Sequence, residues 1–347
     1  MGSVSRPARP LERNIFVTEI RNIPYFDGHC DTIWKCMHTD STAARGGREA
    51  GQTDGAAACA SLRENGGHID LLRGQQYSKR AQFFALFDNV RKLPENTAWT
   101  KTREMHDWLI FQIQENSDLV TLCRNGAEVD AAAAQHKTAA LLSIEGADLI
   151  DCSLANLETA AAWGVRLINP VWNNANILCG SCAQDPDRGL SAIGYEFVAK
   201  MNEFGIYTDV PHISDAAFWD VLRCAKGPVV ASHSNSRAPG LCQHRRNLTD
   251  DMFRAVRDTG GVVGINLYRE FVGGDTMDDL VAHIEHFLSL DGESTVCLGG
   301  DMDGCAVLAA GMTGVENVAE LYRALEEKGY PRPLLEDIFW NNWRRML

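Results

Sequence analysis

Short apolar runs recur along the chain and alternate with longer amphipathic stretches. Eight of the runs have the length and composition of strands: Ile23–His29, Ala81–Phe87, Ala139–Glu145, Val165–Val171, Gly205–His212, Pro228–His233, Gly261–Leu267 and Thr295–Gly300. Five stretches between them have the periodicity of amphipathic helices, several behind a Ser, Thr or Asp cap: Asn156–Trp163, Tyr195–Phe204, Ser214–Cys224, Thr249–Thr259 and Met277–Leu290. Strands that alternate with helices are typical of parallel α/β architecture. Eight such units without a linker-like break predict a single (β/α)8 barrel of the TIM type.

The barrel is expected to occupy residues 23–347, behind a loose N-terminal arm at residues 1–22. The arm is basic from Arg6 to Arg13, but it lacks the apolar core of a signal peptide. Residues 39–65 are rich in Gly, Ala and polar side chains, which predicts a long loop above the mouth of the barrel.

Charge and cysteine content narrow the classes of partner and compartment. The formal net charge of −13 argues against nucleic acid and against an anionic membrane, because both bind through basic patches. No run approaches the roughly 18 apolar residues of a membrane-spanning helix. Eleven scattered cysteines suit reduced thiols in the cytoplasm better than a disulfide framework. Cys179 and Cys182 have the spacing of a redox or zinc pair, but they lie in a polar loop with no second pair, which argues against both roles.

Metal-binding side chains stand at the carboxyl ends of several predicted strands. His29 and Asp31 close the first run, and residues two apart in a strand face the same side, so both can bind one cation. Glu145 closes the third run, and its two carboxylate oxygens can bridge two metals held close together. Each feature alone has an ordinary structural explanation, such as a helix cap or a surface carboxylate.

Three further strand ends repeat this arrangement. His212 and His233 each end an apolar run, where imidazole suits zinc or a similar divalent ion, and Asp301 follows the last run. Of the ten histidines, only these two and His29 occupy strand ends, and the other seven lie in loop or helix contexts. Because barrel enzymes keep their sites at the carboxyl ends of strands, the joint pattern predicts a metal site. Phosphate-binding, dinucleotide-binding, His-Glu-x-x-His and Gly-x-Ser-x-Gly motifs are absent from the sequence.

Seven segments in order resemble the membrane (renal) dipeptidase family of zinc peptidases, part of the amidohydrolase superfamily. The resemblance extends from about residue 27 to residue 347. The segments are Asp-Gly-His-Cys-Asp-Thr (27–32), Ile-Glu-Gly-Ala-Asp (144–148), Asp-Val-Pro-His-Ile-Ser-Asp (209–215), Ala-Ser-His-Ser-Asn-Ser-Arg (231–237), Arg-Arg-Asn-Leu-Thr-Asp-Asp (245–251), Gly-Gly-Val-Val-Gly-Ile-Asn-Leu-Tyr (260–268) and Gly-Gly-Asp-Met-Asp-Gly (299–304).

The resemblance implies a role for each candidate ligand. It implies that His29 and Asp31 bind one zinc ion and that His212 and His233 bind a second. Glu145 would bridge the two, so the implied cofactor is two Zn²⁺ per chain.

The resemblance also implies roles around the metals. Asp301 would handle the proton of the bridging water, and Tyr268 would line the site. Arg246, just before Asn-Leu, would hold the free carboxylate of the substrate. Two more residues than expected separate it from His233, which leaves Arg245 as an alternative.

Trp172 and Asn173 depart from the mammalian-type enzymes of that family. Those enzymes carry a histidine after the fourth strand that polarises the scissile carbonyl, and Trp172 aligns with it here. The Trp-Asn pair resembles a variant of bacterial members. An indole N–H can donate a hydrogen bond but cannot bind a metal, so zinc or Asn173 is expected to polarise the carbonyl.

The leading functional hypothesis is a metal-dependent dipeptidase that cleaves dipeptides with a free C-terminal carboxylate, using a water that bridges two zinc ions. Another amidohydrolase, a deacylase or lactonase, is the first alternative; several of those bridge their metals with a carboxylated lysine. Here Lys137 precedes the strand and Glu145 ends it, which counts against that alternative. A catalytically inactive barrel that serves as a binding protein is the second. The sequence leaves the oligomeric state open, a homodimer included.

Overall fold

The computed structural model describes residues 18–38 and 61–347. Of the predicted N-terminal arm it describes residues 18–22, which include the short 3-10 helix η1 (Ile20–Asn22). Most of the predicted loop at residues 39–65 lies outside the described residues, and residues 61–65 form no helix or strand.

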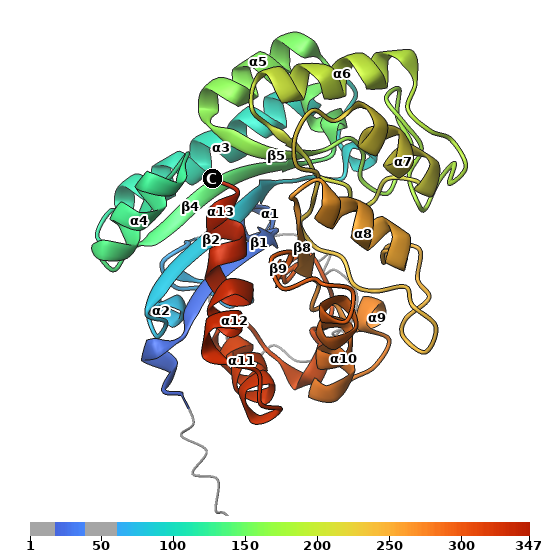
Figure 1. Cartoon of the computed structure of the whole chain (residues 1–347). Helices are drawn as coiled ribbons and strands as arrows, with labels where there is room; N and C mark the ends of the chain where they lie inside the picture. Colours follow the sequence, from blue (N-terminus) through green and yellow to red (C-terminus); the bar gives the residue numbers. More distant parts are fainter. Residues whose placement is uncertain (1–17, 39–60) are drawn as a thin grey trace, which may run out of the picture.

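Nine parallel strands in the described residues form one sheet, and eight of them make up the wall of a barrel (Figure 1). They are β1 (Pro24–Cys30), β2 (Lys79–Leu86), β3 (Val120–Leu122), β4 (Thr138–Glu145), β5 (Val165–Asn169), β6 (Tyr207–Thr208), β7 (Val230–Ala231), β8 (Val262–Ile265) and β9 (Val296–Leu298). The order around the wall is β6-β5-β4-β2-β1-β9-β8-β7, and β3 pairs with β4 outside it. A parallel bridge between Asp209 and Val230 brings β6 to β7. The sheet is therefore a nearly closed barrel, which confirms the predicted TIM-type fold.

Each of the eight predicted runs overlaps one barrel strand, but several strands end earlier than the apolar pattern suggests. β6 ends at Thr208 and β7 at Ala231, so His212 and His233 lie in the loops that follow and not at the strand ends themselves. β3 was not predicted, because three residues with two half-exposed side chains have no clear apolar period.

Helices cover the outside of the barrel. The five predicted ones are α5 (Leu154–Trp163), α6 (Ala192–Glu203), α7 (Asp215–Cys224), α8 (Asp250–Asp258) and α10 (Met277–Leu288). Each begins after a Ser or Thr whose side-chain oxygen accepts a backbone N–H of the first turn. The others are α1 (Thr32–Met37), α2 (Leu71–Gly74), α3 (Ala98–Glu115), α4 (Gly126–Ala134), α9 (Arg269–Val272), α11 (Val318–Glu327), α12 (Arg332–Glu336) and α13 (Asn342–Arg345). Among the described residues, no helix is both long enough and apolar enough to cross a membrane.

The C-terminal segment fills the barrel interior from the amino-terminal ends of the strands. Trp343 of α13 packs against Phe26 and Phe83, with ring centroids 6.0 and 5.2 Å away, and its indole N–H donates to the Leu298 carbonyl at 2.7 Å. A side chain at Gly28 would place its Cβ 2.1 Å from the Trp343 ring, so glycine is required there. The polar side chains at the carboxyl ends of the strands therefore stand on a packed apolar floor.

Candidate metal centre

Glu145 lies at the centre of the candidate site, at the last position of β4. Ala139 and Leu141 of the same strand belong to the apolar cluster inside the barrel, and alternation points Glu145 inward as well. Its Oε1 lies 2.9 Å from His212 Nε2 and 3.7 Å from His233 Nε2. Its Oε2 lies 3.7 Å from His29 Nε2 on the other side. The two oxygens of one buried carboxylate thus face two different sets of ligands.

His29 and Asp31 approach Glu145 from β1, and an irregularity in that strand orients them. The register of β1 against β2 shifts between Asp27 and Cys30, where β1 has one residue more than its partner. Such a bulge exchanges the two faces of a strand, so Phe26 and His29 can both face the barrel axis. Asp31 is no longer in the strand; it is the N-cap of α1, and its Oδ2 lies 4.0 Å from His29 Nε2.

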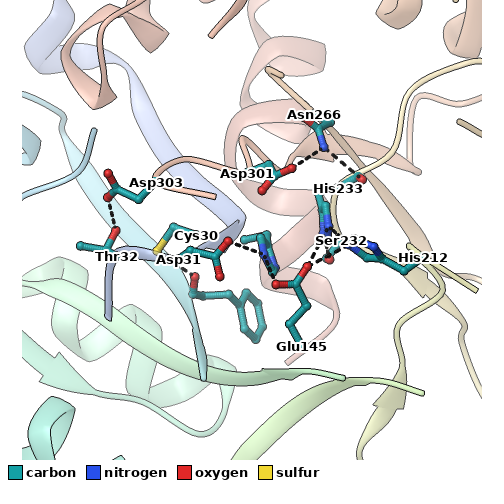
Figure 2. Close-up of polar contacts among 12 residues, drawn as sticks. Cys30, Asp31, Thr32, Glu145, His212, Ser232, His233, Asn266, Asp301 and Asp303 are labelled. Carbon is teal, nitrogen blue, oxygen red and sulfur yellow. Dashed lines mark hydrogen bonds and ion pairs between the residues drawn. The ribbon is translucent and has the colours of Figure 1, made fainter. Parts of the chain in front are cut away.

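His212 and His233 approach from the opposite side, with their Nε2 atoms 3.3 Å apart (Figure 2). The backbone of His212 is left-handed, with φ 75°, which turns its ring toward Glu145. The His212 Nδ1 lies 2.9 Å from the Asn173 amide oxygen. An amide oxygen only accepts, so Nδ1 carries the hydrogen and the Nε2 lone pair faces the site.

A buried hydrogen-bond chain orients His233 in the same way. The Ser232 hydroxyl donates to Asp209 Oδ2 at 2.6 Å, and the Ser232 N–H donates to Asp209 Oδ1 at 2.8 Å. With its own hydrogen given to Asp209, the Ser232 oxygen accepts the Nδ1–H of His233 at 2.7 Å, which leaves the Nε2 lone pair for a metal. Burial raises the pKa of Asp209 to about 7, and burial together with the nearby His29, Arg246 and His212 lowers the pKa of His233 well below its usual value. The lowered pKa favours the neutral form of His233, in which imidazole binds metals.

Asp301 follows β9 and completes the polar cluster. Its carboxylate, that of Asp31 and the His29 ring provide atoms that all lie within 4.8 Å of one another. The Asn266 amide donates to Asp301 Oδ2 at 3.0 Å (Figure 2). Asp303 is oriented elsewhere: it accepts hydrogen bonds of 2.7 Å from the Thr32 hydroxyl and the His68 N–H. The structure thus brings Asp301, and not Asp303, to the candidate ligands.

Arg246 is buried beside the histidine pair, whereas Arg245 is exposed. The Arg246 Nη2 donates to His212 Nε2 at 3.1 Å, and the guanidinium lies 5.2 Å from the centre of the Phe271 ring. Its Nε and Nη1 find no hydrogen-bond partner among the described residues. Tyr268 is half-buried and packs edge-on against the same Phe271 ring, at 4.8 Å. Arg246 therefore has two buried N–H groups that an anionic ligand could accept from.

Trp172 and Asn173 contact the site differently. The Trp172 ring lies 5.0 Å from Phe87 and 6.2 Å from His212, so it forms an aromatic wall beside the ligands. Asn173, which was expected, as an alternative to zinc, to polarise the substrate carbonyl, has its side-chain oxygen on His212 Nδ1, where it orients a candidate ligand.

Three contributors to the site were not identified from the sequence: Asp209, Ser232 and Asn266. Ser232 directly precedes His233, and Asp209 stands three residues before His212. A buried polar residue next to a candidate ligand is the signal that could have revealed the first two, because ligating histidines need a second hydrogen-bond partner.

These donor atoms suit divalent cations. Zinc bonds of about 2.0–2.2 Å place neighbouring ligand atoms about 3.3–3.6 Å apart in a tetrahedral shell. The distances from Glu145 to the three imidazoles, and those within each ligand set, range from 2.9 to 4.0 Å. Three imidazoles with carboxylates favour zinc or a similar transition metal over magnesium or calcium, which prefer all-oxygen sites.

The chain as a whole is similar in sequence to known proteins. A family model described as membrane dipeptidase (peptidase family M19) matches residues 16–347. The chain is 36% identical over 248 residues to an uncharacterised protein in the pqqA 5′ region of Klebsiella pneumoniae, which covers 68% of this chain and 90% of that protein. It is 35% identical over 282 residues to an uncharacterised dipeptidase of Schizosaccharomyces pombe, which covers 74% of this chain and 65% of that protein.

Two solved structures share the fold over 94% of this chain and 98% of their own. One is a metallopeptidase from Rhodobacter sphaeroides liganded with a phosphinate mimic of the dipeptide L-Ala-D-Ala, with 24% identity and a TM-score of 0.80. The other is a metallopeptidase named dipeptidase AC, of family M19, with 26% identity and a TM-score of 0.79.

Proposed function

The chain belongs to the membrane dipeptidase family of metallopeptidases, and from this premise we propose that it hydrolyses dipeptides with a free C-terminal carboxylate at a centre of two zinc ions. The observation that carries the proposal is the position of Glu145, whose Oε1 faces His212 and His233 while its Oε2 faces His29. A carboxylate in this position can join two cations that otherwise have separate ligands.

Each ligand set has its own orientation. His29 and Asp31 would hold one ion with Glu145 Oε2, and His212 and His233 would hold the other with Oε1. When bound, two such ions lower the pKa of a water molecule toward about 7 and polarise a carbonyl.

The remaining residues would act on the substrate and on protons. Asp301, held at its Oδ2 by Asn266, would accept the proton of the attacking water and deliver it to the leaving nitrogen. Arg246 would hold the substrate carboxylate through the Nε and Nη1 groups that find no partner within the described protein. Trp172 would form the wall of the substrate site. The phosphinate bound to the Rhodobacter sphaeroides relative supports the proposed hydrolysis of dipeptides, because its tetrahedral phosphorus resembles a carbonyl after attack by water.

The deacylase or lactonase alternative receives no support from the lysines around β4. Lys137 directly precedes the strand, at the end of β4 opposite to Glu145. Its ammonium group therefore belongs to the other end of the barrel, and Glu145 has the position that a bridging ligand needs. An inactive binding barrel would have no need for the orienting contacts of His212 and His233.

Glu145→Gln tests the proposal. We expect about two zinc ions per wild-type chain after dialysis against buffered zinc, and a loss from both sites in the variant, because glutamine has one weakly ligating oxygen in place of two. Hydrolysis of alanyl-alanine should fall in parallel. Glu293→Gln, an exposed substitution before β9, is the matched control and should retain both ions and activity. Full metal content with normal turnover in Glu145→Gln would contradict the bridging role.

A further inference from the structure

A cavity extends from Glu145 away from the histidine pair. Its inner part, about 80 Å³, is lined by Glu145 and Trp172 among others, and an outer part of about 580 Å³ adjoins it. The two parts share the lining residues Val90, Arg91 and Asp148, so they adjoin each other. The outer volume falls within the roughly 300–1,000 Å³ typical of small-molecule sites.

This cavity lies across the barrel mouth from Arg246. The residues around it follow β2, β4 and β5, which are neighbours in the wall, whereas Arg246 lies in the loop after β7. A dipeptide whose carboxylate contacts Arg246, and whose peptide bond lies at Glu145, would therefore direct its N-terminal residue toward this cavity.

The lining is apolar along the walls and acidic at several points. Its apolar members in the outer part are Val90, Leu93, Pro94, Ala98, Cys152 and Ile177. Glu95, Asp148 and Asp151 add three carboxylates, against one basic side chain, Arg91, among the lining residues in the described part of the chain. A lysyl or arginyl side chain has the matching form, an apolar stem that ends in a cation.

Asp148 stands where the two parts meet. Its Oδ2 accepts a hydrogen bond from the Asn176 amide at 2.9 Å, and burial raises its pKa above the usual value. A cation from a ligand would offset this cost of burying the carboxylate. Arg91 is exposed, and its Nη2 donates to Gln184 Oε1 at 2.5 Å. Its charge lowers the pKa of Asp148 and so offsets only part of the effect of burial.

We propose that this cavity is the subsite for the side chain of the substrate's N-terminal residue, and that Asp148 and Asp151 select a cationic side chain there. The inference rests on the proposed dipeptidase function and adds its substrate class. The two carboxylates would select the positive charge of the substrate side chain, because the apolar walls alone would accept a neutral side chain of the same length.

The test compares three dipeptides that differ in the N-terminal side chain: lysyl-alanine, its neutral counterpart norleucyl-alanine, and glutamyl-alanine. The readout is the ratio of kcat/KM for lysyl-alanine to that for norleucyl-alanine. We expect a ratio of about ten in the wild type, as for a charge-assisted contact that is partly screened by solvent, and a glutamyl substrate poorer than both.

Substitutions at the cavity test whether its charged residues cause the preference for lysyl-alanine. Asp148→Asn, which keeps an oxygen for Asn176, should bring the ratio to about one, chiefly by lowering kcat/KM for lysyl-alanine. Arg91→Gln should raise the ratio, because it removes a like charge. Asp291→Asn, an equal change of net charge in the turn before β9, is the control and should leave the ratio unchanged. Should Asp148→Asn fold poorly, Asp151→Asn gives the same readout at a left-handed position (φ 54°) that asparagine tolerates.

Two negative results remain distinct. A wild-type enzyme that cleaves all three dipeptides equally well would overturn the subsite and leave the dipeptidase function intact. The same holds if Asp148→Asn and Asp151→Asn both preserve the ratio, or lower hydrolysis of lysyl and norleucyl substrates in parallel. A zinc-loaded enzyme that cleaves no dipeptide would instead contradict the proposed function itself.

Discussion

Replacing Ser232 by alanine should weaken one metal site and spare the other. The Ser232 hydroxyl joins Asp209 to His233, with contacts of 2.6 and 2.7 Å, and all three side chains are fully buried. Without it, His233 Nδ1 loses the partner that directs its Nε2 lone pair at the metal. Partners of this kind typically contribute about 10–100-fold in metal affinity, which corresponds to about 1.4–2.7 kcal/mol.

The metal-free protein should also lose stability. The variant leaves Asp209 Oδ2 and His233 Nδ1 without the serine hydroxyl, and each buried group deprived of its partner typically costs about 1–3 kcal/mol. Asp209 limits its own part of this cost, because its pKa is already raised to about 7 and it can take up a proton. We therefore expect destabilisation toward the lower end of the range.

Equilibrium dialysis against a series of buffered free-zinc concentrations measures this effect. The wild type and Ser232→Ala should agree for the ion expected at His29 and Asp31, and differ by about 10–100-fold for the ion expected at His212 and His233. Ser234→Ala is the matched control: it is the same substitution two residues on, and the Ser234 hydroxyl is buried without a hydrogen-bond partner among the described residues. Equal affinity for both ions in Ser232→Ala and Ser234→Ala would refute the reasoning.

Four further predictions concern the substrate and the metals. Asp301→Asn should fold, retain its metals and lose about 10²–10⁴ in kcat, measured at matched metal occupancy, whereas near-normal turnover would remove Asp301 from proton transfer. Arg246→Met should raise KM for dipeptides with a free carboxylate, by a factor that corresponds to a few kcal/mol of binding free energy. The wild-type enzyme should hydrolyse amidated dipeptides poorly. If wild type and variant each hydrolyse free and amidated dipeptides equally well, Arg246 does not hold the substrate carboxylate. Trp172→Phe should cost little in kcat, since the ring lies beside His212 as a wall, and a thousand-fold loss would show that its N–H takes part in the reaction. Chelation should lower the thermal midpoint in stages, because bound metals stabilise the folded state, and a midpoint independent of zinc would contradict a metal centre.

The sequence alone predicted the barrel, and it identified Glu145 as the central candidate ligand. Eight apolar runs with intervening helices predicted the parallel architecture, because strands buried on both faces are continuously apolar. Glu145 was identifiable because β4 is a regular strand. Side chains two residues apart in such a strand point to the same face, so Glu145 faces the barrel interior as Leu141 does.

The tertiary structure decided features that depend on distant contacts. Asp209 and Ser232 come from different loops, and their alignment with His233 requires β6 and β7 to meet at the closure of the barrel. α13 was not predicted as part of the core, since its tryptophan enters a barrel built from residues far earlier in the chain.

Backbone irregularities set the remaining limit on prediction. The bulge in β1 changes which residues face the axis, and the left-handed backbone at His212 turns a loop side chain into the site. Burial of its side chain against Phe271 in the folded loop favours Arg246 over the exposed Arg245, and the sequence does not show this difference. Periodic patterns determine regular strands and helices, because they reflect repeating local geometry. The orientation of loop and bulge residues depends on single backbone angles that only the packed molecule determines.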